Sequence, residues 1–212
     1  MINDFENSII NLDIEKSIQY CKEIIGSGQT EPIDILKTIS KALDVVGQKY
    51  EEKEYFLSEL IMAGEIVNEL LKIINPLYKR DESTRVATMV LASVKGDLHD
   101  IGKNILGMLL RSSNFDVIDL GTDVDSDEIV KAVKQNDADF VGLSALLTTT
   151  IHEFGNIVED FNKAGLRNKV KIIVGGSAVN EDVAKKYHVD GWGKTAVEGV
   201  KICRQWATKV GD

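Results

Sequence analysis

Residues 85–110 read RVATMVLASVKGDLHDIGKNILGMLL, and this stretch decides the fold. A short, fully apolar run over residues 86–92 comes first, a polar loop follows it, and residues 101–110 then repeat apolar side chains at helical spacing. An apolar run without alternation is typical of a strand that is buried on both faces, as in parallel sheets. The stretch therefore predicts one strand–loop–helix unit of an α/β fold.

The same unit repeats along the rest of the chain. Further strands are expected at residues 115–120, 140–143, 170–174 and near 190–192, and further helices at 129–133, 151–161, 179–186 and 195–208. Alternation of strand and helix indicates a parallel sheet that is covered by helices on both faces. We therefore expect a five-stranded, open, Rossmann-like sheet of the flavodoxin-like type, which binds ligands at the carboxyl ends of its strands.

The N-terminal third of the chain contains only helical patterns. Apolar stripes at helical spacing run over residues 10–21, 35–46 and 57–74. The first is expected to be a single helix, and Pro76 ends the third because proline cannot continue a helix. These stripes predict a small antiparallel bundle of three or four helices.

A short charged stretch separates the two regions. Residues 79–83 read KRDES, and we take them as the linker. The sequence thus predicts two domains, a helical cap at residues 1–80 and an α/β domain at residues 85–212.

The composition excludes several classes of protein. The 212 residues include 25 Lys and Arg against 34 Asp and Glu, which gives a formal net charge of −9. An acidic chain is repelled by nucleic acid and by anionic membranes, so we expect neither as a partner. No apolar run is long enough for a bilayer, and the N-terminus lacks the pattern of a signal peptide. We expect a soluble, cytoplasmic protein.

The loop after the first strand contains the residues with the clearest chemistry, Asp97 and His99. No cysteine stands beside this histidine and no second histidine is obviously near, so a nucleophilic or zinc site is poorly supported. A lone imidazole with a neighbouring carboxylate suits one axial position of a cofactor metal. The carboxylate accepts a hydrogen bond from the N–H of one ring nitrogen and leaves the other nitrogen free to bind the metal.

Other marked residues have simpler interpretations. His152 and His188 are expected at the surface or at helix ends, and Cys21 and Cys203 fall on apolar helix stripes and are expected in the core. Residues 191–195, GWGKT, are similar to the end of a phosphate-binding loop. The full pattern needs a glycine where His188 stands, so this match fails.

Three motifs in the α/β region carry a resemblance to a known family. They are, in chain order, Asp97-x-His99-x-x-Gly102, Ser144-x-Leu146 and Gly175-Gly176. Together they resemble the cobalamin-binding signature of corrinoid proteins and of methionine synthase, and residues 47–60 are similar to the cap pattern of small corrinoid proteins. The resemblance covers nearly the whole chain and implies cobalamin, in its methylcobalamin form, as the cofactor.

The resemblance also implies roles for single residues. His99 would replace the cofactor's own dimethylbenzimidazole as the lower axial ligand of cobalt, Asp97 would hydrogen-bond its other ring nitrogen, and Thr150 would complete a relay. The residues implied to contact the cofactor beside these are Gly96, Leu98, Asp100, Gly102, Ser144, Leu146, Thr148, Gly175 and Gly176. The cap residues implied to cover the upper face of the corrin are Tyr55, Phe56, Leu57 and Met62.

A corrinoid protein of this type is a methyl carrier that cannot run the whole reaction alone. It would accept a methyl group from a substrate-specific methyltransferase and deliver it to a second one, acting on tetrahydrofolate or a methanogenic thiol in anaerobic one-carbon metabolism. A reductive activase would be a third partner. Residues 143–150 resemble carriers that serve methylamines or methoxylated aromatics. Two alternatives stay open, a cobalamin-dependent regulator or light sensor and the cobalamin subunit of a mutase.

Overall fold

The computed structural model describes residues 1–77 and 85–210. The chain divides into two compact units, Met1–Lys79 and Arg80–Asp212. The linker expected at residues 79–83 lies outside the described residues, so it stays a prediction. Within the described ranges, no helix is both long enough and apolar enough to span a membrane.

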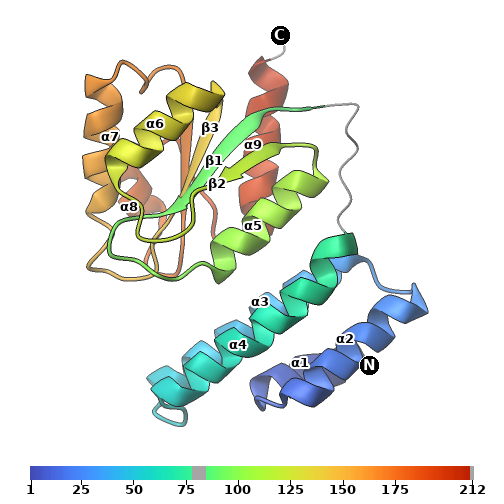
Figure 1. Cartoon of the computed structure of the whole chain (residues 1–212). Coiled ribbons are helices and arrows are strands. Elements are labelled where there is room, and N and C mark those ends of the chain that lie inside the picture. The colour runs from blue at the N-terminus through green and yellow to red at the C-terminus, as the bar shows by residue number, and fades with distance from the viewer. Residues whose placement is uncertain (78–84, 211–212) are drawn as a thin grey trace. The chain divides into compact units, whose positions relative to one another are not determined.

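The first unit is a bundle of four helices, as Figure 1 shows. They are α1 (Ile2–Ile10), α2 (Ile14–Ser27), α3 (Pro32–Glu51) and α4 (Leu57–Ile74), and a 3-10 turn at Asn75–Leu77 follows the last of them. Helix α1 packs against α2 and α3, and α4 packs against the same two helices. The apolar stripes meet in a core that includes Phe5, Ile9, Cys21, Ile24, Ile35, Leu36, Ile39, Ile66 and Leu70. The helical N-terminal region is confirmed.

The expectation of a single helix over residues 10–21 is wrong. Helix α1 ends at Ile10, Leu12 takes a left-handed conformation with φ 60°, and Asp13 is the N-cap of α2, which begins at Ile14. The Asp13 carboxylate accepts a hydrogen bond from the backbone N–H of Lys16 at 3.1 Å, which satisfies one donor of the first turn. The apolar spacing continues across this break because both helices face the same core.

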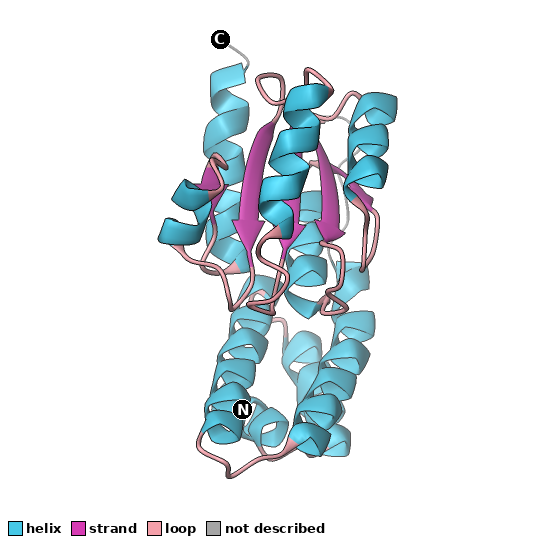
Figure 2. Ribbon diagram, turned by 90° about the vertical axis from the view of Figure 1, so that its left-hand side faces the viewer, coloured by secondary structure: helices cyan, strands magenta, loops and turns pink. Residues whose placement is uncertain are grey.

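The second unit is a five-stranded parallel sheet with the order β2-β1-β3-β4-β5 (Figures 1 and 2). The strands are β1 (Thr88–Ser93), β2 (Asp116–Asp119), β3 (Phe140–Ser144), β4 (Lys171–Gly175) and β5 (Gly191–Trp192). The helices are α5 (Ile101–Ser112), α6 (Ser126–Asn136), α7 (Glu153–Lys163), α8 (Glu181–Lys186) and α9 (Ala196–Val210). This arrangement confirms the Rossmann-like sheet predicted from the alternating pattern.

Helices cover both faces of this sheet (Figure 2). Alternate strand residues such as Val90, Val141 and Val174 belong to one apolar cluster that includes residues of α6, α7 and α8. The residues between them, such as Met89 and Phe140, belong to a second cluster with α5 and α9. Burial on both faces explains why the central strands β1, β3 and β4 are largely apolar without alternation.

The carboxyl ends of the central strands meet at one edge of the sheet. Ser93 of β1 pairs in register with Ser144 of β3, and Ser144 pairs with Gly175 of β4. Because all strands run in the same direction, the loops that follow them gather at this edge. The residues singled out by the sequence after β1, β3 and β4 therefore lie in one region.

Candidate functional site

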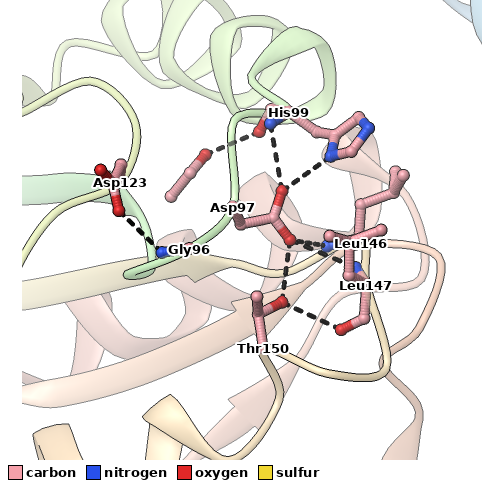
Figure 3. Close-up of polar contacts among 8 residues, drawn as sticks. Gly96, Asp97, His99, Asp123, Leu146, Leu147 and Thr150 are labelled. Atoms are coloured by element: carbon pink, nitrogen blue, oxygen red, sulfur yellow. Dashed lines mark hydrogen bonds and ion pairs between the residues drawn. The ribbon is translucent and has the colours of Figure 1, made fainter.

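The loop between β1 and α5 places Asp97 behind the His99 ring (Figure 3). Asp97 is fully buried, and its Oδ1 accepts hydrogen bonds from His99 Nδ1 at 2.8 Å and from the His99 backbone N–H at 3.1 Å. An ionised carboxylate only accepts, so Nδ1 must carry the proton. Nε2 is then left with its lone pair, on a side chain that is 51% exposed.

The second oxygen of Asp97 is held by the loop after β3. Its Oδ2 accepts hydrogen bonds from the backbone N–H groups of Leu146 at 2.7 Å and Leu147 at 3.2 Å, and from the Thr150 hydroxyl at 2.9 Å. Figure 3 shows these donors converging on the carboxylate from the side opposite His99. One buried carboxylate thus joins the β1–α5 and β3–α7 loops.

These contacts decide the charge of Asp97. Burial alone raises the pKa of its carboxyl group, but hydrogen bonds from His99, Leu146 and Leu147 favour the ionised form and outweigh burial. The pKa of Asp97 therefore lies below its usual value. The group stays an acceptor at neutral pH, which keeps the proton of His99 on Nδ1.

Two further residues hold the backbone of this loop, and the sequence analysis did not name them. The Ser93 hydroxyl donates to the carbonyl oxygen of His99 at 2.7 Å, and Asp123 Oδ1 accepts from the backbone N–H of Gly96 at 2.8 Å. Gly96 has φ 79°, which favours glycine. The sequence signal available for Ser93 was its position as a polar residue at the end of a mostly apolar strand.

The other residues expected at the site lie in or next to the loops at the same edge of the sheet, and their side chains do not hydrogen-bond Asp97. Leu98 and Gly102 are exposed on either side of His99, and Asp100 directly precedes α5. Ser144 is half-buried at the end of β3, and Thr148 is exposed in the following loop. None of these side chains contributes to the hydrogen bonds on Asp97, which come from His99, Leu146, Leu147 and Thr150. Their contact with a cofactor stays a prediction.

Packing within the fold helps to explain why glycine is found at the two positions at the end of β4, Gly175 and Gly176. Gly176 has φ 118°, and a Cβ built there would overlap the backbone carbonyl of Ala145. A Cβ at Gly175 would lie 3.4 Å from the carbonyl oxygen of Gly193. The sequence interpretation assigned both glycines to a ligand, whereas the structure already requires Gly176 for the approach of two backbones.

In the helical unit, the residues expected over the corrin differ in exposure. The Tyr55 hydroxyl donates to the Ile10 carbonyl at 2.7 Å, so this ring anchors the α3–α4 loop inside the unit. Phe56, Leu57 and Met62 are exposed apolar side chains at the start of α4. Their role at a cofactor stays a prediction.

The residues of the site fit a metal that is already bound in a macrocyclic cofactor. Among the residues that the structure describes, no group of three or more His, Cys, Asp or Glu side chains could hold a metal ion. The protein offers one oriented imidazole nitrogen, and the exposed apolar side chains of Leu98, Leu146 and Leu147 belong to the same two loops. A corrinoid would suit this combination, because its ring would bring most of the nitrogen ligands of its metal, His99 would add one more, and the leucines would contact the ring.

Comparison with known proteins agrees with this chemistry. Two family models, both described as B12 binding domain, match residues 1–75 and 87–201. A trimethylamine corrinoid protein of Methanosarcina barkeri is 33% identical, over 92% of this chain and 91% of that protein. The Methanosarcina barkeri monomethylamine corrinoid protein has the same fold, with a TM-score of 0.86, 26% identity and 95% coverage of both chains. The methanol:cobalamin methyltransferase complex from that organism matches with a TM-score of 0.56 and 27% identity, over 98% of this chain and 79% of that one. The chain therefore belongs to the family of B12-binding corrinoid proteins.

Proposed function

We propose that this protein binds cobalamin through His99 and carries a methyl group between two methyltransferases. When bound, cobalamin supplies a cobalt centre that takes up and releases the methyl group. The observation that carries the proposal is the contact at 2.8 Å between Asp97 and His99 Nδ1, which leaves Nε2 free at the open edge of the sheet. A carboxylate–histidine pair of this kind orients a metal ligand and increases its basicity.

The other residues of the site keep this ligand in one state. Leu146, Leu147 and Thr150 donate to the far oxygen of Asp97, so the carboxylate cannot turn away from the imidazole. Nε2 is open to a ligand from outside, because the side chain is 51% exposed. The relay of His99, Asp97 and Thr150 therefore leaves one nitrogen atom for a metal, and a histidine nitrogen must be without a proton to bind one.

The relatives support a place in a methyltransferase system. Those named above include a trimethylamine and a monomethylamine corrinoid protein and a methanol:cobalamin methyltransferase complex. We infer a methylamine-specific methyltransferase as the donor partner. A methyltransferase for tetrahydrofolate or a methanogenic thiol is the acceptor partner, and a reductive activase restores the reduced cofactor in the cytoplasm.

Electron paramagnetic resonance of the cobalamin-loaded protein in the cobalt(II) state tests the ligand. Nitrogen-15 labelling of the protein is expected to change the axial nitrogen splitting, and His99→Ala is expected to remove it. His152→Ala is the matched control, because His152 is exposed and hydrogen-bonds the Thr149 carbonyl. A splitting that ignores the label would refute His99 as the ligand.

Transfer of labelled methyl tests the carrier role. Protein loaded with labelled methyl is expected to lose the label to an acceptor methyltransferase and to regain it from a methylamine methyltransferase. Isomerisation that depends on adenosylcobalamin would instead identify a mutase subunit. Light-dependent association or retention on DNA would identify a regulator.

A further inference from the structure

Lys103 is a buried lysine in the first turn of α5, four residues after His99. Its side chain is 3% exposed, and its Nζ lies 2.6 and 2.7 Å from the two carboxylate oxygens of Asp119, the last residue of β2. The third contact of Nζ is with Asn104 Oδ1 at 2.8 Å. An ammonium group is buried at such a position only when its charge and its donors are satisfied, and here they are.

Asp119 is connected to both ends of the loop that contains His99. On the β1 side, Asp119 Oδ1 accepts from the Gly121 N–H at 2.9 Å, and the Gly121 carbonyl accepts from the Ser93 N–H at 2.9 Å. The Ser93 hydroxyl in turn donates to the His99 carbonyl at 2.7 Å. On the α5 side, Asp119 holds Lys103 directly. One carboxylate therefore fixes where the loop begins and where it ends.

Asn104 extends this network to the residue beside the histidine. Its Oδ1 accepts from Lys103, so its amide group must point its Nδ2 the other way, and Nδ2 donates to Asp100 Oδ2 at 3.0 Å. The Asn104 backbone N–H also donates to the Asp100 carbonyl, at 2.7 Å. The ammonium of Lys103 thus orients the group that holds Asp100, the next residue after His99.

We propose that Lys103 and Asp119 form a positioning pair that sets the place of His99 and the strength of its bond to cobalt. This inference rests on the proposed function, since it assumes that His99 binds the metal. In the part of the chain that the structure describes, the polar contact of the His99 ring is with Asp97, so Lys103 and Asp119 would act through the loop backbone. A loop that is loose before binding must be ordered when the metal binds, which weakens the bond, whereas the Lys103–Asp119 pair orders the loop beforehand.

Two variants of the full-length protein test the pair. Lys103→Met keeps the length of the side chain and removes the charge, and Asp119→Asn keeps the volume and removes the charge from the partner. Arg167→Met is the matched control, because Arg167 forms a comparable half-buried pair with Asp190, 2.8 Å away and linked to the amino end of β4. All variants are loaded with cobalamin and brought to equal occupancy by cobalt content.

The first readout is the axial nitrogen splitting of cobalt(II) with nitrogen-15-labelled protein. We expect the equilibrium constant for binding of His99 to cobalt to fall by about 10- to 100-fold in Lys103→Met and Asp119→Asn. A loss of this size is typical when a supporting partner of a metal ligand is removed. The second readout, amide hydrogen exchange of residues 95–102 in cofactor-free protein, is expected to accelerate by about 10-fold in the same variants. Arg167→Met is expected to change neither.

The possible failures are distinguishable. If both variants keep the wild-type splitting and the wild-type exchange rates, the pair is a structural ion pair only and the inference is overturned. If the wild-type protein itself shows no splitting from its own nitrogen, the ligand assignment of the proposed function fails, and the positioning role fails with it. Should Lys103→Met not fold, Asp119→Asn decides the question by the same two measurements.

Discussion

Replacing Asp97 with Asn tests whether this carboxylate decides which nitrogen of His99 carries the proton. The amide keeps the shape of the side chain but substitutes an NH2 group for one acceptor oxygen. At the Oδ2 position, this NH2 would face the N–H groups of both Leu146 and Leu147. At the Oδ1 position, it faces only the backbone N–H of His99, because the imidazole can change tautomer and accept at Nδ1. We expect the second orientation.

The magnitude follows from the one donor that loses its partner in that orientation. A fully buried backbone N–H without an acceptor costs about 1–3 kcal/mol, and the His99 N–H is only partly buried, so the free energy of unfolding of Asp97→Asn is expected to fall by about 1 kcal/mol, the lower end of this range. The tautomer change has a larger functional consequence. The proton of His99 moves to Nε2, which then has no lone pair for a metal.

Nitrogen-15 spectra of the imidazole in cofactor-free protein report the tautomer directly, and urea unfolding reports the stability. The wild-type protein is expected to show Nδ1–H and Asp97→Asn to show Nε2–H, with loss of the axial nitrogen splitting after loading. Asp125→Asn is the control, because Asp125 is exposed and its carboxylate pairs with Lys95. Persistence of Nδ1–H in Asp97→Asn would refute the reasoning.

Three shorter predictions concern the same unit. Gly176→Ala is expected to lower the free energy of unfolding in urea well beyond the roughly 1–2 kcal/mol expected for Gly121→Ala, because both have positive φ but only Gly176 meets backbone where the Cβ would lie. Equal losses would contradict this. Partial burial of Asp190 raises the pKa of its carboxyl group, but hydrogen bonds from a backbone amide and from two cationic side chains outweigh this effect and lower the pKa. Asp190→Asn is therefore expected to lose about 1–3 kcal/mol at neutral pH, a deficit that is full above about pH 4 and shrinks as the pH falls further; a deficit that is independent of pH would argue against this. Thr150→Val removes one hydrogen bond to Asp97 and is expected to cost about 1.5–3 kcal/mol in urea unfolding, whereas Thr150→Ser should retain it.

The sheet could be predicted from the sequence because its central strands, such as β1 and β3, are largely apolar runs and a polar loop follows each of them. The helical unit was harder, since an apolar stripe records which face is buried and not whether the backbone is continuous. The break at Leu12 shows this, because Ile9 and Ile24 face one core on either side of it. Asp13, a good N-cap residue directly before Ile14, was the local signal for a new helix.

The side chains at the centre of the site could also be predicted, but their energetics could not. Asp97 and His99 stand out by residue type and spacing, and Thr150 was named through the resemblance to the cobalamin-binding signature. The donors that hold Asp97 in its ionised form include the backbone N–H groups of Leu146 and Leu147, and a backbone amide has no signature in the sequence. The connection from Ser93 to Asp119 could not be predicted either, because it runs through the backbone N–H and carbonyl of Gly121.

The two ring nitrogens of His99 lie in opposite environments, and under the proposed function this asymmetry would let a half-exposed side chain serve as a well-defined ligand. All the polar contacts of the ring that the structure describes are on the Nδ1 side, with a carboxylate that is itself buried and saturated by donors. The orientation of the ring is therefore fixed by Asp97 on its Nδ1 side. If His99 is the ligand, as we propose, the folded protein orders its ring before the cofactor arrives, which lowers the ordering cost of binding.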